Sequence, residues 1–298
     1  MTNPEILIIG QGPAGLSAAI YTARAGLATL VLGTEPKVAG DYSIDNYFGF
    51  PDAISGKELI GRGVSQAKKF GVAIEHERVL GIHFADAGGY NVVTDRRELY
   101  ACSVILATGI ERKKPPIANL AEFEGRGVSY CVSCDGYFFK NKNIMVAGEG
   151  NYAANQAIEL LGYSPSVRIC TLGRKPAMNE EFAASISKAG IPVIRHTITA
   201  LRGEARLTGA VLDTGETLDV DGLFVAVGDA SSLDFARTLG MITQGNFIEV
   251  DAGQRTNVPG IFAAGDCTGS FLQISVAVGE GARAAKSAIE YVKKICRA

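Results

Sequence analysis

The sequence lacks the features that mark membrane, secreted and nucleic-acid-binding proteins. Its net charge is only −2, which offers no electrostatic basis for binding nucleic acid or an anionic membrane. No apolar run approaches the roughly 20 residues of a membrane span. The chain enters an apolar run after five residues without a basic segment, so we expect no secretory signal.

Cysteine and histidine are also scarce. Six cysteines and three histidines in 298 residues do not make a disulfide scaffold, and the simplest interpretation is a cytoplasmic protein with mostly reduced, buried thiols. Only Cys131 and Cys134 are closely spaced, and no second pair completes a zinc site, so we expect no metal centre. The single cysteines are Cys102, Cys170, Cys267 and Cys296.

A dinucleotide-binding pattern opens the chain. The apolar residues 6–9 indicate a buried parallel strand, and they lead into G-Q-G-P-A-G at 10–15, which fits G-x-G-x-x-G. A helical pattern and a second buried strand at 28–32 follow. Glu35 then lies 20 residues after Gly15, where such folds use an acid to bind a ribose hydroxyl. Because all these elements occur in the expected order, we predict a dinucleotide site here.

The same pattern begins again in the second half of the chain. A strand at 144–147 enters G-E-G-N-Y-A at 148–153, followed by a helical pattern and another strand. A β-ribbon is expected after each unit. In the first unit, short alternating segments at 72–75, 79–84 and 90–94 predict this antiparallel ribbon.

The composition between the two units predicts a domain boundary. The stretch R-K-K-P-P at 112–116 is polar and then stiff, as linkers are. Near the C-terminus, a strand ending at Asp266 and a long helix return to the first domain. We therefore predict an α/β fold with two Rossmann-like three-layer dinucleotide-binding domains, the second inserted into the first. The expected domains are 1–113 with 245–298, and 114–244.

The most chemically distinctive stretch is C-V-S-C-D at residues 131–135. Two cysteines at this spacing can close a small disulfide, and their reactivity when reduced follows the thiolate fraction. Asp135 could donate protons to the thiolates. An isolated C-x-x-C near βαβ patterns is typical of redox-active pairs, although a structural C-x-x-C in a dehydrogenase is an alternative. Tyr137 and Phe138 follow, either as an apolar docking surface or as core packing.

With these motifs in hand, the chain resembles a low-molecular-weight thioredoxin reductase of the bacterial kind. The glycine turns, the loop around Asn46, A-T-G at 107–109, C-x-x-C-D-G with its aromatics, and A-x-G-D with the terminal helix stand in that family's order over nearly the whole length. The resemblance implies FAD in the first domain and a nicotinamide-type second domain carrying the cysteines. The implied cofactor-binding residues are Gly10, Gly12, Pro13, Ala14, Gly15, Glu35, Asn46, Gly265, Asp266, Gln273 and Ile274.

The resemblance also implies an activity. Electrons would pass through FAD to a Cys131–Cys134 disulfide and on to thioredoxin or a thioredoxin-like protein, with Asp135 as the proton donor. The family places Cys134 nearer the flavin, although the residues themselves leave the order of the two cysteines open. Family members are homodimers, and we expect the same here.

The second domain departs from the family where NADPH should bind. A His-Arg-Arg run that grips the 2′-phosphate is replaced by Thr-Leu-Gly at 171–173, and Glu149 places a charge in the turn that should hold a pyrophosphate. The chain resembles family members that lack this motif and take electrons from ferredoxin, so we expect ferredoxin as donor. NADPH held by Arg174 and Lys175 from a shifted loop stays an alternative, as does a redox sensor without turnover.

Overall fold

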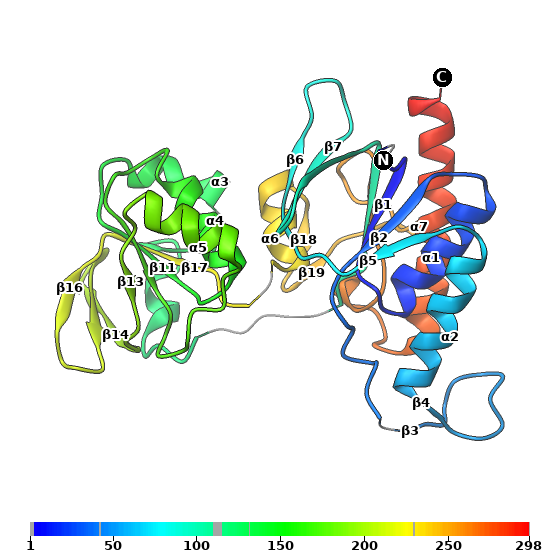
Figure 1. Ribbon diagram of the computed structural model, residues 1–298, viewed down its shortest axis with the longest axis horizontal. Helices are drawn as coiled ribbons and strands as arrows, with labels where there is room; N and C mark the ends of the chain where they lie inside the picture. The colour runs from blue at the N-terminus through cyan, green and yellow to red at the C-terminus, as the bar shows by residue number, and fades with distance from the viewer. Residues whose placement is uncertain (1–2, 42, 110–114, 131, 229, 298) are drawn as a thin grey trace. The chain divides into compact units, whose positions relative to one another are not determined.

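The computed structural model describes residues 3–41, 43–109, 115–130, 132–228 and 230–297, and for Ser133 and Cys134 it describes the backbone. The chain divides into two compact units, Met1–Glu111 with Ser231–Ala298, and Arg112–Ala230. Each unit is built on a parallel five-stranded sheet (Figure 1). The predicted α/β class with two Rossmann-like units is therefore confirmed.

The boundaries of the units can be compared with those expected. The expected boundary after 113 lies outside the described residues. The first unit resumes at Ser231, earlier than the expected start at 245. Helix α6 (Ser232–Leu239) accounts for the difference, because it packs against strand β6 of the first unit.

The sheet of the first unit has the order β20-β9-β1-β2-β5. Every side chain of β1, β2 and β9 is buried, as expected for parallel strands covered on both faces. Helices α1, α2 and α7 pack on one face, and the ribbon β6–β8 lies on the other side of the sheet (Figure 1). The strands are β1 (Ile6–Ile9), β2 (Thr29–Leu32), β5 (Ala73–Glu75), β9 (Ser103–Leu106) and β20 (Ile261–Ala263), the helices α1 (Pro13–Arg24), α2 (Gly56–Lys69) and α7 (Ile274–Tyr291), and the ribbon strands β6 (Val79–Phe84), β7 (Tyr90–Thr94) and β8 (Glu98–Ala101).

One sequence prediction in this unit was wrong. The segment at 72–75 was assigned to the ribbon, but β5 pairs with β2 in parallel as the fifth strand of the sheet. The third ribbon strand is instead β8, which pairs with β7. A three-residue strand carries too little pattern to choose its partner, and the crossover helix α2 delivers it to the parallel sheet.

The sheet of the second unit has the order β10-β17-β11-β12-β13, and a second ribbon, β14–β15–β16, shares a hydrophobic core with it. This unit therefore repeats the plan of the first, as predicted. The strands are β10 (Val128–Ser129), β11 (Ile144–Ala147), β12 (Val167–Cys170), β13 (Val193–Ile194), β14 (Ile198–Gly203), β15 (Leu207–Leu212), β16 (Thr217–Asp219) and β17 (Gly222–Val225), and the helices α3 (Val132–Asp135), α4 (Asn151–Leu160) and α5 (Glu180–Lys188), with short helices η1 (Leu120–Phe123) and η2 (Gly136–Phe139).

Short elements complete the first unit. Two small strand pairs lie in its loops, and two short helices, η3 and η4, flank α7. Within the described ranges, no helix is both long and apolar enough to cross a membrane. The short elements of the first unit are β3 (Ser43–Ile44), β4 (Ile54–Ser55), β18 (Thr243–Gln244), β19 (Phe247–Ile248), η3 (Asp266–Thr268) and η4 (Val292–Cys296).

The cysteines differ in part from the expectation of reduced, buried thiols. Cys170 and Cys267 are free and buried. Burial raises the pKa of the Cys267 thiol to about 12, which makes it unreactive near neutral pH. Cys102 and Cys296, in contrast, form a disulfide across 194 residues of sequence. In the described part of the chain, no cluster of three or more potential ligand side chains could hold a metal ion.

Candidate functional site

The first glycine turn joins β1 to α1 with no space for side chains at two of its glycines. Gly10 has a φ of +121°, and a Cβ there would lie 2.1 Å from the carbonyl oxygen of Ala107 on the neighbouring strand's end. A Cβ on Gly15 would lie 1.9 Å from the carbonyl oxygen of Gly10. The Gly10 N–H donates to the Leu32 carbonyl at 2.7 Å. The turn is therefore locked to both neighbouring strands.

The middle of the same turn is open. Gly12 is the N-cap of α1, and a Cβ there would meet only the Pro36 side chain, at 3.9 Å. Pro13 begins the helix, no side chain caps it, and its first turn contains no acid. The leading N–H groups of a helix have no partner within it and attract an anion, so this end of α1 suits a phosphate.

The end of β20 converges on the same edge. A Cβ on Gly265 would lie 3.0 Å from the Ala14 side chain, and a Cβ on Gly281 would lie 2.2 Å from the Ala14 carbonyl oxygen. These small residues allow α1, α7 and the turn that carries Asp266 to pack tightly together. The sequence predicted this meeting, because carboxyl ends of parallel strands share one edge of a sheet.

A buried acid organises the turn that carries Asp266. Glu280, 7% exposed, accepts hydrogen bonds from the Gly265 N–H at 2.8 Å, from the Thr268 hydroxyl at 3.2 Å and from the Ser270 hydroxyl. Burial, and then the charge of Glu280, raises the pKa of Asp266. Sequence reasoning missed Glu280. The available signal was a single acid among the small residues of an otherwise apolar helix face.

Of the remaining predicted cofactor-binding residues, two contact each other and Glu35 is exposed. Asn46 donates to the side-chain oxygen of Gln273 at 3.1 Å, so the loop and the start of α7 meet as expected, with Ile274 as the first helical residue. Glu35 is exposed beyond the end of β2. The Thr108 hydroxyl oxygen is buried and has no partner in the described chain.

These features fit a flavin dinucleotide. The turn has room at Gly12 where a side chain would otherwise sit, and α1 and α7 both begin without a capping side chain. The unpartnered Thr108 hydroxyl is a free hydrogen-bonding group near the carboxyl edge of the sheet. The buried Gln11, which the sequence reasoning passed over, supports the turn by donating to the carbonyls of Gly33 at 2.8 Å and Glu75 at 2.9 Å.

The redox stretch follows strand β10 of the second unit. Cys131 lies outside the described residues, and the backbone of Cys134 lies in α3. The predicted proton donor is held in place, because the buried Ser129 donates to a carboxylate oxygen of Asp135 at 2.6 Å. Ser129 ends the strand and Asp135 ends the short helix, so this contact closes the turn between them.

The aromatic residues after the cysteines separate into two groups. Tyr137 and Phe138 are 72% and 74% exposed, with their rings edge to face at 6.2 Å. Phe139 points inward and packs edge to face on Phe224 at 5.3 Å. Core packing, which the sequence left open for Tyr137 and Phe138, therefore applies to Phe139 instead.

The second glycine turn has the same backbone contacts as the first. A Cβ on Gly148 would lie 2.1 Å from the carbonyl oxygen of Ala226, and its N–H donates to Cys170 at 2.9 Å. Gly150 is the N-cap residue of α4, and no side chain caps this helix. A Cβ on Gly150 would meet nothing within 4 Å. The repeat inferred from the sequence is thus also a repeat of geometry.

Side chains make the second turn different. Glu149 pairs with Arg174 at 2.5 Å between Oε1 and Nη1, and its other carboxylate oxygen is buried without a partner among the described residues. The Ala177 N–H donates to the Glu149 carbonyl at 2.7 Å, and the Asn179 N–H donates to the Asn151 side chain at 2.8 Å. The segment after β12 therefore folds back onto the start of α4, and Arg174 is already neutralised.

The hydroxyl group of the 171–173 stretch is also engaged. Thr171 is fully buried, and its hydroxyl donates to the Arg174 carbonyl at 2.7 Å. Leu172 and Gly173 follow with positive φ, which turns the chain sharply back. Arg174 and Lys175, the basic residues that could hold a 2′-phosphate from a shifted loop, are both exposed, and Arg174 is the one paired with Glu149.

Comparison with known proteins agrees with this arrangement. The family model described as pyridine nucleotide-disulphide oxidoreductase matches residues 4–281. The thioredoxin reductase of Treponema pallidum (strain Nichols) is 36% identical over 306 aligned residues, covering 98% of each chain. The crystal structure of the atypical thioredoxin reductase TRi from Desulfovibrio vulgaris Hildenborough is 55% identical over 99% of both chains, with a TM-score of 0.97. A ferredoxin-flavin thioredoxin reductase structure from Clostridium acetobutylicum is 29% identical over 98% of both chains, with a TM-score of 0.72.

The fold and its two glycine turns define an oxidoreductase of the two-dinucleotide-domain class. With the family model and these relatives, the chain belongs to the low-molecular-weight thioredoxin reductase family of the pyridine nucleotide-disulphide oxidoreductases. The family resemblance inferred from the motifs is therefore confirmed.

Proposed function

We propose that this chain is an FAD-dependent protein-disulfide reductase whose substrate is thioredoxin or a thioredoxin-like protein. The relatives named thioredoxin reductase span nearly the whole chain, and the C-x-x-C-D motif is the most specific feature they would share with it. FAD would be held by the open first turn at Gly12, Pro13 and Ala14, with Asp266 and Gln273 on the same edge. We further propose a cytoplasmic homodimer, on family resemblance.

The proposed chemistry uses the two cysteines in sequence. Bound flavin, once the electron donor has reduced it, would supply the two electrons that open the Cys131–Cys134 disulfide. One thiolate then attacks the substrate disulfide to form a mixed disulfide, and the second cysteine resolves it, which restores the original pair and releases a reduced dithiol. Asp135, oriented by the 2.6 Å hydrogen bond from Ser129, would supply protons to the departing thiolates.

Substrate docking is proposed for Tyr137 and Phe138. Two neighbouring aromatic side chains that are more than two-thirds exposed are costly to leave in water and are common anchors of protein interfaces. They follow the redox cysteines directly in sequence, so a docked protein would lie beside the reacting sulfurs. Neither ring belongs to the core of the second unit, which uses Phe139 instead.

For the electron donor, we propose reduced ferredoxin rather than NADPH. The observation that carries this choice is the Glu149–Arg174 ion pair in the second glycine turn. A carboxylate occupies the turn that should receive a pyrophosphate, and the nearest guanidinium is bound to it. Each lost charge-assisted hydrogen bond removes about 1.5–3 kcal/mol, so two would weaken NADPH binding roughly a hundredfold or more.

The donor test is an anaerobic comparison. The oxidised protein is mixed with NADPH, NADH or reduced ferredoxin, and flavin bleaching is followed by absorbance. We expect rapid, complete bleaching with ferredoxin and slow bleaching with micromolar NADPH. Fast bleaching by NADPH would overturn the donor assignment while leaving the disulfide reductase intact. Multiple turnover with a thioredoxin disulfide separates an enzyme from a redox sensor.

A pair of variants tests the ion pair itself. Glu149→Ala removes the acid and releases Arg174, so bleaching by NADPH should accelerate several-fold. Glu58→Ala is the matched control, because Glu58 forms a similar pair with Arg62 at 2.7 Å on helix α2 of the first unit. Equal NADPH rates in both variants would show that Glu149 is not the barrier.

A further inference from the structure

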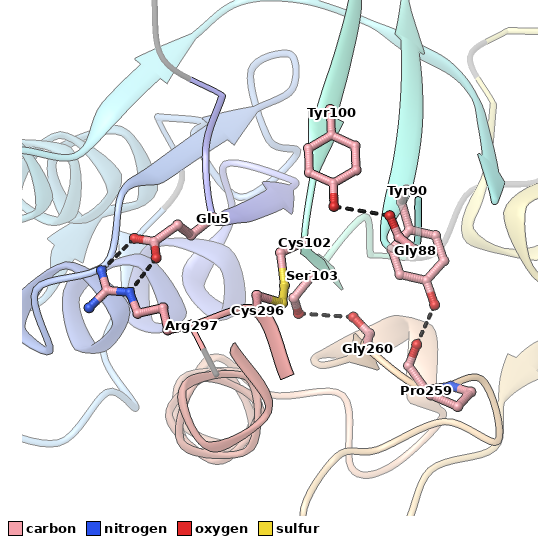
Figure 2. Close-up of a disulfide and its surroundings, with 10 residues drawn as sticks. All are labelled: Glu5, Gly88, Tyr90, Tyr100, Cys102, Ser103, Pro259, Gly260, Cys296 and Arg297. Atoms are coloured by element: carbon pink, nitrogen blue, oxygen red, sulfur yellow. Dashed lines mark hydrogen bonds and ion pairs between the residues drawn. A yellow bond between two sulfur atoms is a disulfide. The ribbon is translucent and has the colours of Figure 1, made fainter. Parts of the chain in front are cut away.

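The Cys102–Cys296 disulfide is a second sulfur pair, distinct from the C-x-x-C motif. Its Cα atoms are 6.4 Å apart, within the range that a disulfide can bridge, and it joins residues 194 positions apart. Cys102 is 5% exposed, whereas Cys296 is exposed in the terminal turn η4. Figure 2 shows the bond between the start of β9 and the end of the C-terminal helix.

The pair lies at the opposite edge of the first sheet from the proposed flavin turn. Cys102 directly precedes β9, and Ser103 bonds to the carbonyl of Gly260, which directly precedes β20. The glycine turn follows the carboxyl end of β1. Four residues of strand separate the two edges, which is roughly 13 Å. The Cys102–Cys296 pair therefore does not contact the glycine turn.

Non-covalent contacts hold the terminal turn in place independently of the disulfide. Arg297 pairs with both carboxylate oxygens of Glu5, at 2.5 and 2.8 Å (Figure 2). It also donates to the Gly26 carbonyl at 3.1 Å. Glu5 also accepts from the Ala28 N–H at 2.9 Å. The Arg297 contact lowers the pKa of Glu5. These contacts keep Cys296 beside Cys102 when the bond is open, which raises the effective concentration of one thiol near the other.

We propose that Cys102 and Cys296 form a reversible second thiol–disulfide couple, which staples the C-terminal helix to the first sheet when closed. Exchange occurs at the exposed Cys296 with a dithiol. One dithiol sulfur bonds to Cys296, the sulfur–sulfur bond breaks, and the electron pair leaves on Cys102, which takes a proton. The second dithiol sulfur then attacks the first and releases Cys296. The dithiol is oxidised by two electrons and the protein pair is reduced by two.

The first test measures the couple directly. In a Cys131→Ser/Cys134→Ser background, the folded protein is equilibrated in mixtures of reduced and oxidised dithiothreitol, and free thiols are trapped by alkylation and identified by mass spectrometry. We expect a single reversible transition at Cys102 and Cys296. Reduction should lower the Tm by roughly 5 °C or more, because opening releases a long loop in the unfolded chain. Alkylation of both cysteines under oxidising conditions, or reduction only after unfolding in urea, would overturn the proposal.

Two further variants test the staple and the contacts that present it. Cys296→Ser should have the Tm of the reduced protein and should no longer respond to dithiothreitol. An oxidised protein with the same Tm as Cys296→Ser would disprove the stapling.

Arg297→Ala should make the pair about two- to fivefold easier to reduce, the range expected for losing one exposed ion pair. Arg255→Ala is the control. The Arg255 side chain is 47% exposed, against 45% for Arg297, and it pairs with Glu290 of helix α7. An equal shift in both variants would contradict the role of Arg297.

Discussion

The two glycine turns share a backbone and differ in what their side chains do. A Cβ on Gly10 or on Gly148 would meet a carbonyl oxygen of the next strand at the same distance, 2.1 Å. Both helix starts are uncapped, but the residue before the N-cap is Gln11 in the first turn and Glu149, paired with Arg174, in the second. The comparison shows that the two turns share their backbone contacts with the sheet while their side chains differ. In the function we propose, this side-chain difference sets whether a turn binds a phosphate.

The turns also differ at their last position. The first has Gly15, where a Cβ would lie 1.9 Å from the Gly10 carbonyl oxygen. The second has Ala153 at the corresponding place, and that residue is fully buried. Helix α1 therefore approaches the glycine turn before it more closely than helix α4 does.

The largest effect that separates the turns should come from this last position. Gly15→Ala should destabilise the protein by about 3 kcal/mol or more, because a rigid backbone oxygen occupies the new methyl's place. Ala153→Gly should cost about 1 kcal/mol, the usual helix penalty for glycine. Chemical denaturation of both variants measures the difference. Similar losses would mean that the two turns are equally tight.

The next contrast concerns the open N-cap glycines. Gly12 and Gly150 have φ of −79° and −107°, so either can become alanine without backbone strain. Gly12→Ala should reduce FAD affinity by about tenfold or more, because the methyl fills the proposed pyrophosphate position. Gly150→Ala should leave FAD affinity unchanged. Fluorescence titration of the apoprotein with FAD tests both, and unchanged binding by Gly12→Ala would place the dinucleotide elsewhere.

The smallest effect concerns Glu280, the buried acid that accepts hydrogen bonds from the turn carrying Asp266. Burial and Glu280 raise the pKa of Asp266, so the folded state favours its protonated form. The unfolding free energy of the apoprotein should therefore fall as pH rises from the ordinary carboxyl range through the raised pKa.

Glu280→Gln should make that fall shallower, since one of its two causes is removed. Urea denaturation between about pH 4 and about pH 7 measures the slope. The control is Glu290→Gln, an exposed acid on the same helix. An identical slope in the wild type and Glu280→Gln would show that Glu280 does not act on Asp266.

Local pattern alone was enough for most of the architecture. Continuous apolar runs at β1 and β11, each followed by a glycine turn and a helix, specify buried parallel strands because neighbouring residues carry the whole signal. The C-x-x-C-D motif at 131–135 and the aromatics after it were equally visible in the sequence, since a motif of this kind is defined by short spacing. The strand β5 was misassigned because three residues do not specify a partner.

Contacts between distant residues were decided only in the tertiary structure. Glu149 and Arg174 stand 25 residues apart, Gln11 reaches the Glu75 carbonyl across 64, and Cys102 meets Cys296 across 194. The sequence named Glu149 and Arg174 as charges but did not predict that they neutralise each other. Pattern reports which residue types are present along the chain, whereas an ion pair or a disulfide requires two side chains to be brought together by the packing of whole elements.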